Sequence, residues 1–184
     1  MIKNVKRITN LLAASTCVAL CGCSTPKWQS RLDTVLPEYG HRNWIVIADA
    51  AYPKQSAAGI ETVATGKDHF QVLEAVLAAI DAAPHVQSIV MLDAEMEHVA
   101  SEDAPGVAEY RARLKDVLKD RPVQVKPHEE IIAKLDADSG MFNVLLLKTD
   151  LVIPYTSVFL QLDCGYWNAE KEARLRRLIL EENK

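Results

Sequence analysis

The sequence predicts a single α/β domain in which a central mixed sheet is flanked by helices. Short apolar runs rich in β-branched residues alternate along the chain with segments whose apolar residues recur at helical spacing. The 184 residues are enough for one domain with its own core. No internal repeat or low-complexity segment interrupts the alternation.

Six apolar runs predict the strands. The run 44–48 has no polar residue and lies between turn-forming residues, which is typical of a strand buried on both faces. An acidic loop, 95–103, follows the third run. We expect strands at 44–48, 60–64, 88–92, 123–125, 142–147 and 157–162.

Five helices are predicted between and after these strands. Ser30, Asp68 and Asn168 each precede a periodic apolar pattern and suit the N-cap position. Pro105 is expected to begin the third helix and His128 to open the fourth. The expected helices are 31–36, 69–82, one from 105, one from 128 and one from 168 to the end of the chain.

The first 22 residues have the composition of an export signal. Lys3, Lys6 and Arg7 form a positive region, and the apolar stretch 11–20 is short for a membrane span. The stretch ends in Leu20-Cys21-Gly22-Cys23, which resembles a bacterial lipobox. A plain secretory signal and a short membrane anchor are the alternatives.

The lipobox resemblance implies that Cys23 becomes the lipidated first residue of the mature protein. The chain would then be exported and held at the bacterial envelope by its acyl chains. Ser24 after the cysteine favours the outer membrane of a Gram-negative cell, with the domain on the periplasmic face. In this interpretation 1–22 is the signal peptide, 23–30 a tether, 31–164 the domain and 165–184 an additional C-terminal helix.

Cysteine content agrees with this interpretation. Cys17 and Cys21 would leave with the leader and Cys23 would be acylated, so that Cys164 alone remains. A single cysteine forms no internal disulfide. Cys164 follows an apolar strand, where a packed small residue is more common than a nucleophile.

Composition and motifs exclude several classes of function. The chain carries 21 basic and 25 acidic residues, so no basic field indicates nucleic-acid binding. It lacks the glycine-rich nucleotide motifs and the GxSxG elbow, and His128-Glu129-Glu130 lacks the second histidine of HExxH. Metal-ligand spacing is also absent, so we do not expect a metal enzyme.

The candidates for chemistry lie near strand ends, where a rigid sheet can hold functional groups. They are His41, Asp49, His128, Lys148 and Tyr155. Each also has a structural interpretation: a solvated loop histidine, a turn-capping aspartate or a tyrosine that packs with its hydroxyl at the surface.

Three segments in order carry a resemblance to a known family. Gly40-His41 is followed eight residues after the histidine by Asp49-Ala50, and Lys126-Pro127-His128-Glu129 places a second histidine at a helix start. Lys148-Thr149 and Pro154-Tyr155-Thr156-Ser157 follow. Together these resemble the D-ribose pyranase and L-fucose mutarotase family (RbsD/FucU), over roughly residues 31–164.

The resemblance implies interconversion of cyclic monosaccharide forms without cofactor or metal. An acid protonates the ring oxygen while a base takes the anomeric hydroxyl proton, and the ring closes again in another form; histidine suits this near neutral pH. By resemblance His41 is the proton donor. The residues that would hold sugar hydroxyls are Asp49, His128, Tyr155, Thr156 and Ser157.

The resemblance also bears on assembly. A straight strand could separate His41 from Asp49 by roughly 26 Å. One site uses both only if the turn at 40–42 folds back or a neighbouring subunit supplies one of them. The family forms rings with sites at interfaces, so we expect a homo-oligomer, either a pentamer or a pair of pentameric rings.

The chain departs from the family in three places. Ser157 replaces the usual asparagine, the segment 150–153 is more apolar than usual, and the last helix lies beyond the family's normal end. Export is also unusual for the family. An alternative is therefore a monosaccharide-binding lipoprotein without turnover on the same fold, and a weaker one is a structural envelope lipoprotein with a vestigial pocket.

Overall fold

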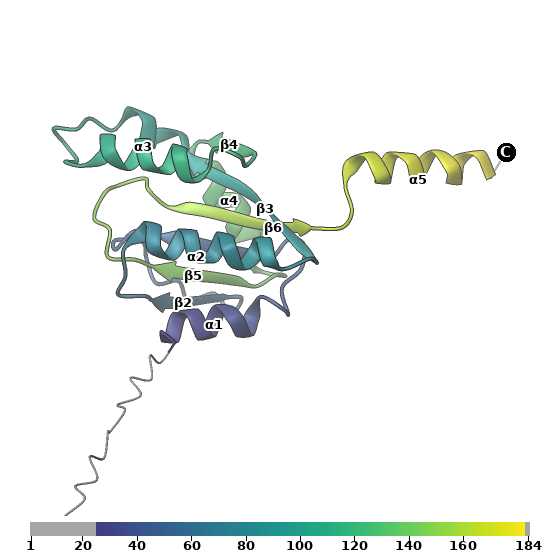
Figure 1. Ribbon diagram of the computed structural model, residues 1–184, viewed down its shortest axis with the longest axis horizontal. Helices are drawn as coiled ribbons and strands as arrows, with labels where there is room; N and C mark the ends of the chain where they lie inside the picture. Colours follow the sequence, from purple (N-terminus) through teal and green to yellow (C-terminus); the bar gives the residue numbers. More distant parts are fainter. Residues whose placement is uncertain (1–24, 183–184) are drawn as a thin grey trace, which may run out of the picture.

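The computed structural model describes residues 25–182, so the expected signal peptide and the expected lipidation at Cys23 lie outside the described residues. The described chain forms five α-helices, one short 3-10 helix and six strands (Figure 1). The helices are α1 (Lys27–Val35), α2 (His69–Ala82), η1 (Ala94–His98), α3 (Val107–Val117), α4 (His128–Ser139) and α5 (Ala169–Glu182). The strands are β1 (Trp44–Ala48), β2 (Ile60–Ala64), β3 (Val86–Asp93), β4 (Val123–Lys126), β5 (Val144–Lys148) and β6 (Val158–Cys164).

One mixed sheet contains all six strands, in the order β2-β5-β1-β6-β3-β4. β6 runs antiparallel to both of its neighbours, β1 and β3. The other pairs, β2 with β5, β5 with β1 and β3 with β4, are parallel. The predicted α/β class with a central mixed sheet is therefore confirmed.

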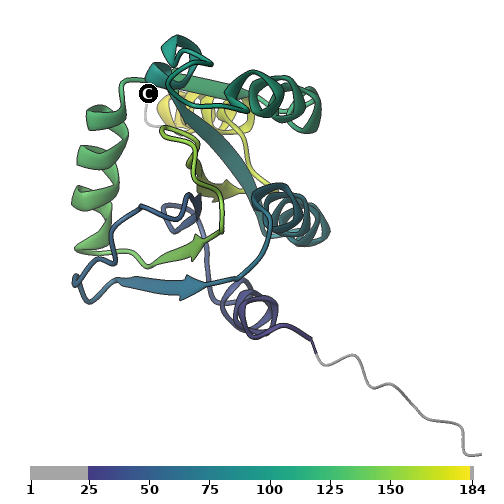
Figure 2. The same ribbon diagram turned by 90° about the vertical axis from the view of Figure 1, so that its left-hand side faces the viewer.

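Helices cover both faces of the sheet, as Figure 2 shows. Side chains on a strand alternate between faces. Ile45 and Ile47 pack in the core shared with α1, α2 and α3, whereas Trp44 and Val46 pack in the core shared with α4. All five residues of β1 are buried, as expected for a strand covered on both sides.

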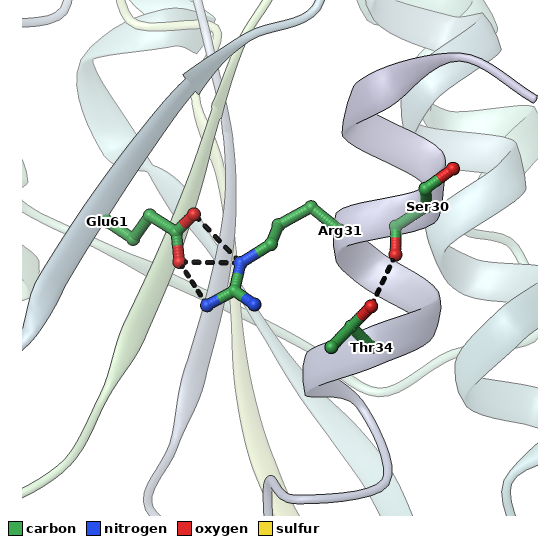
Figure 3. A network of polar contacts seen from close by, with 4 residues as sticks. All are labelled: Ser30, Arg31, Thr34 and Glu61. Carbon is green, nitrogen blue, oxygen red and sulfur yellow. Dashed lines mark hydrogen bonds and ion pairs between the residues drawn. The ribbon is translucent and has the colours of Figure 1, made fainter.

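An ion pair fastens α1 to the edge of the sheet (Figure 3). The Nε of Arg31 donates to both carboxylate oxygens of Glu61 on β2, each at 2.8 Å. The expectation that Ser30 caps this helix was wrong, because α1 begins at Lys27 after Pro26. Ser30 lies inside the helix, where its carbonyl accepts a hydrogen bond from Thr34. Proline is itself a common signal for the start of a helix, because its fixed φ is compatible with the first turn.

Other boundaries moved by a few residues. The third helix begins at Val107 and not at Pro105, because Gly106 takes a left-handed conformation with φ of 91°. η1 occupies the start of the expected acidic loop. The Asp68 and Asn168 caps are confirmed by hydrogen bonds of 3.1 and 2.9 Å from the backbone amides three residues on.

α5 projects away from the rest of the molecule in Figure 1. Every residue described in it is at least partly exposed. α5 follows the end of β6 in the chain. The last residue of β6, Cys164, is a partly buried free thiol. The helix therefore contributes nothing to the core of the domain.

Candidate functional site

The register of three central strands brings polar residues together at one edge of the sheet. Val158, the first residue of β6, pairs with Ile47 of β1 and with Leu92 of β3. Ser157 therefore enters the sheet between Asp49, which follows β1, and Asp93, which ends β3. Ligands of α/β sheets bind at such carboxyl ends of strands, where the strand order changes direction.

Asp49 is held in place by the turn that follows β1. Its Oδ1 accepts a hydrogen bond of 2.8 Å from the backbone amide of Ala51, and its Oδ2 accepts one of 3.4 Å from the hydroxyl of Ser157. The carboxylate is half-buried. Its orientation is therefore fixed while lone pairs remain available for ligand hydroxyls.

The buried Asp93 and the partly exposed His128 form a pair beside Asp49. The Oδ1 of Asp93 lies 3.1 Å from the Nδ1 of His128, and Asp93 is 1% exposed. Burial raises the pKa of Asp93 to about 6, although the contact with His128 acts in the opposite direction. Near neutral pH an ionised Asp93 favours a proton on Nδ1 of His128, which leaves Nε2 as a hydrogen-bond acceptor.

A second carboxylate anchors His128 at the start of α4. Pro127 precedes the helix and offers no side-chain cap. The two carboxylate oxygens of Glu95 instead accept from the backbone amide of His128, at 3.1 and 3.0 Å. Backbone hydrogen bonds, from its own amide and from that of His128, lower the pKa of Glu95. This cap fixes where the imidazole stands.

These groups open into a cavity of about 390 Å³. The ring of Tyr155 stands edge-on to that of His128, with ring centroids 5.8 Å apart. The buried hydroxyl of Tyr52 has no hydrogen-bond partner among residues 25–182, and burial raises the pKa of this phenol. The cavity is lined by Asp49, Ala51, Tyr52, Pro53, Gln55, Asp93, His128, Ile132, Pro154, Tyr155 and Ser157.

Four of the predicted site residues, Asp49, His128, Tyr155 and Ser157, line this one cavity. Thr156, also predicted, is 1% exposed and lies behind the cavity wall. Lys148 ends β5 without lining the cavity.

His41 lies elsewhere in the chain. It is exposed in a turn before β1, and the amide of the next residue, Arg42, donates to the carbonyl of Leu162 towards the far end of β6. The turn does not fold back on Asp49. Within one chain, His41 and Asp49 therefore stand at opposite ends of β1.

Sequence reasoning passed over Asp93, Tyr52 and Gln55. Asp93 carries the same local signal as Asp49, a carboxylate directly after a buried apolar run. Asp93 could therefore have been identified from the sequence by this pattern. Tyr52 and Gln55 lie in the irregular segment 49–59, where no periodicity indicates which side chains turn inward.

A larger hollow of about 530 Å³ lies between α3 and β4, but both of its arginines are engaged elsewhere. Arg111 donates to the carbonyls of Met96 and Val99, and Arg121 pairs with Asp81. It has no buried carboxylate–histidine pair in its lining. The chemistry therefore favours the smaller cavity.

Two further searches concern residues 25–182 alone. They contain no group of three or more histidine, cysteine or acidic side chains arranged to hold a metal ion. No helix in the same range is long and apolar enough to cross a membrane.

The sequence profile of the RbsD / FucU transport protein family matches residues 25–162. The chain belongs to this family. RbsD of Bacillus subtilis, solved in complex with D-ribose, is 24% identical, with a TM-score of 0.52 over 73% of this chain and 92% of that one. The fucose mutarotase of Streptococcus pneumoniae, solved with L-fucose, is 21% identical, with a TM-score of 0.52 over 75% of this chain and 95% of that one. The comparison with curated proteins gives no match.

Membership of the RbsD / FucU family leaves α5 unaccounted for. The family match ends at residue 162, two residues before the end of β6. The candidate cavity, by contrast, lies wholly within the matched residues.

Proposed function

We propose that the chain is an exported monosaccharide mutarotase or pyranase, which interconverts cyclic sugar forms by acid–base ring opening and closure. The observation that carries the proposal is the convergence of Asp49, the buried Asp93 and its neighbour His128 on one cavity walled by Tyr155. The cavity volume of about 390 Å³ falls in the usual range for small-molecule sites. The solved relatives with D-ribose and L-fucose support a monosaccharide as the ligand.

In this proposal His128 acts as the base and Asp49 holds the sugar. The Nδ1 of His128 lies 3.1 Å from Oδ1 of Asp93 without the alignment of a regular hydrogen bond, and the nearby carboxylate favours a proton on Nδ1, so that Nε2 takes the proton of the anomeric hydroxyl. The Asp49 carboxylate accepts from sugar hydroxyls, and the Tyr155 and Ser157 hydroxyls supply further hydrogen bonds. The C1–O5 bond then breaks as the carbonyl forms, and reclosure yields another ring form.

The ring oxygen needs a proton donor, which we assign to His41 of a neighbouring subunit. His41 lies outside the cavity of its own chain. A homo-oligomer, as a pentamer or a pair of pentameric rings, would bring His41 of one subunit to the cavity of the next.

Exchange NMR on a panel of reducing sugars tests turnover. Purified protein should cause exchange broadening of the resonances of interconverting sugar forms, or exchange cross-peaks between them. The variants His41→Ala and His128→Ala should abolish both effects. His98→Ala is the matched control, because His98 is exposed and outside the cavity. Absence of exchange for every sugar tested would refute the enzyme proposal.

Mixed oligomers test the shared site. His41→Ala and Asp49→Ala subunits, each inactive alone, should regain activity when refolded together. Random mixing leaves about a quarter of the sites with both groups intact if neighbours supply His41 in a ring. No recovery from a verified mixture would contradict the assignment of His41 to a neighbour.

The non-catalytic alternative has one observation in its favour, since a single chain holds no His41 at its cavity. A sugar-binding lipoprotein would show saturable binding of a monosaccharide by titration calorimetry with no exchange. In that case His41→Ala would leave binding unchanged, whereas Asp49→Ala would weaken it.

We further propose that the protein is lipid-anchored through Cys23, on the periplasmic face of the outer membrane. The support is the basic start of the chain and the sequence Leu20-Cys21-Gly22-Cys23-Ser24. Wild-type protein should incorporate labelled fatty acid and fractionate with outer membranes. Cys23→Ser should lose both properties, while Cys164→Ser should keep them.

A further inference from the structure

Tyr155 forms the cavity wall in a backbone conformation that a tyrosine rarely adopts. Its φ is 56°, in the left-handed region. This conformation costs a non-glycine residue on the order of 1–2 kcal/mol. Tyr155 is 41% exposed, and its ring stands edge-on to that of His128. The neighbouring residues must therefore hold the segment in place.

The next residue, Thr156, holds the segment in place through its side-chain hydroxyl and its backbone carbonyl. Its hydroxyl donates to the carbonyl of Ile153 at 2.7 Å, which closes a turn around Tyr155. Its carbonyl accepts a 2.8 Å hydrogen bond from the hydroxyl of Tyr110 on α3. Thr156 is 1% exposed and Tyr110 5% exposed, so water does not substitute for either bond.

His69, at the start of α2, supports the Tyr110 hydroxyl from behind. Its Nε2 lies 3.1 Å from that hydroxyl, and its Nδ1 lies 3.3 Å from the hydroxyl of Thr149. Since the Tyr110 proton is donated to Thr156, the Tyr110 oxygen can only accept from Nε2 of His69. The Thr149 hydroxyl donates to the carbonyl of Ala48 at 2.8 Å, so a neutral His69 can donate to Tyr110 or to Thr149 but not to both, and the tautomer with hydrogen on Nε2 is the one that supports Tyr110. Burial lowers the pKa of His69 to about 4, so the ring stays neutral near pH 7.

We propose that His69 and Tyr110 are positioning residues of the candidate site, acting through Thr156 to hold the Tyr155 ring against His128. Neither lines the cavity of Asp49 and His128. The inference rests on the proposed function only where it concerns sugar binding. The order of the segment 154–157 does not depend on turnover.

Tyr110→Phe tests the link with little change in packing, because the ring keeps its contact with Phe70 at 5.0 Å between centroids. Amide hydrogen exchange at 155–157 should accelerate relative to the sheet. The His128 ring-proton chemical shift, which the edge-on Tyr155 ring influences, should move towards its value in Tyr155→Ala. Affinity for D-ribose, measured by calorimetry, should fall roughly tenfold, as expected for a lost buried hydrogen bond. Tyr39→Phe removes the hydroxyl of another buried tyrosine, near the far end of β1, and should change none of these readouts.

A pair of His69 variants separates positioning from simple stability. His69→Gln keeps an amide donor for Tyr110 and should resemble wild type in the His128 shift, whereas His69→Leu should resemble Tyr110→Phe. The proposal is overturned if Tyr110→Phe and His69→Leu leave the His128 shift and the exchange at 155–157 unchanged. It is equally overturned if exchange rises uniformly over the whole domain. If wild-type protein binds no sugar, the proposed function fails while the shift and exchange still decide the positioning role.

Discussion

Asp93→Asn should stabilise the protein at neutral pH, because it removes a carboxylate whose ionised form is costly to bury. Asp93 is 1% exposed, and burial raises its pKa from 3.8 to about 6. Each pKa unit corresponds to about 1.4 kcal/mol, so the ionised form lowers the free energy of unfolding by about 3 kcal/mol.

The sign of the pH dependence follows from the raised pKa. Below about pH 4 Asp93 is protonated in both states and has no effect. Between about pH 4 and 6 the unfolded chain ionises first, so the contribution of Asp93 to stability is lost as the pH rises. Above about pH 6 the full loss remains.

Urea denaturation from pH 4 to 8, followed by tryptophan fluorescence, measures this effect. At pH 7 Asp93→Asn should have a free energy of unfolding higher than wild type by up to about 3 kcal/mol, and the difference should vanish near pH 4. Asp103→Asn, an exposed control, should match wild type throughout. A difference between Asp93→Asn and wild type that stays constant over this range would refute the reasoning.

Two further changes probe other buried features. His69→Gln should show the reverse pH dependence. Burial lowers the pKa of His69 from 6.5 to about 4, so wild type loses stability as the pH falls through this range. In the same denaturation series the variant should escape that loss, which amounts to about 3 kcal/mol. Gly59→Ala should destabilise the domain by about 3 kcal/mol in thermal unfolding, because the added Cβ would clash with the backbone carbonyl oxygen of Ser139; a melting temperature equal to that of wild type would contradict this.

The fold could be predicted because its strands and helices are encoded locally. The five apolar residues 44–48 form β1 with the predicted bounds, and α2 follows its Asp68 cap. Errors arose where two start signals lie close together. At Pro26 and Ser30, and again at Pro105 and Gly106, the position at which the helix begins depends on backbone conformations that a sequence pattern does not specify.

The site could be predicted only in part, since it depends on strand pairing over long distances in the sequence. Asp49 and Ser157 are 108 residues apart and meet because Val158 pairs with Ile47. Asp93 had the local signal of a functional carboxylate. Its contact with His128, which lies at the start of α4, is not revealed by any periodicity.

The Asp93–His128 pair is better explained by chemistry than by stability. At neutral pH the buried Asp93 carboxylate lowers stability, and apolar side chains of similar volume often stabilise a protein more than a buried ion pair does. In the proposed mechanism the carboxylate favours the tautomer of His128 that leaves Nε2 as an acceptor. A single chain would then supply the base and the groups that hold hydroxyls, while its own His41 lies at the opposite end of β1. If His41 of a neighbour completes the site, specific activity should fall on dilution below the concentration at which the oligomer dissociates. Constant specific activity of a verified monomer would require a different acid.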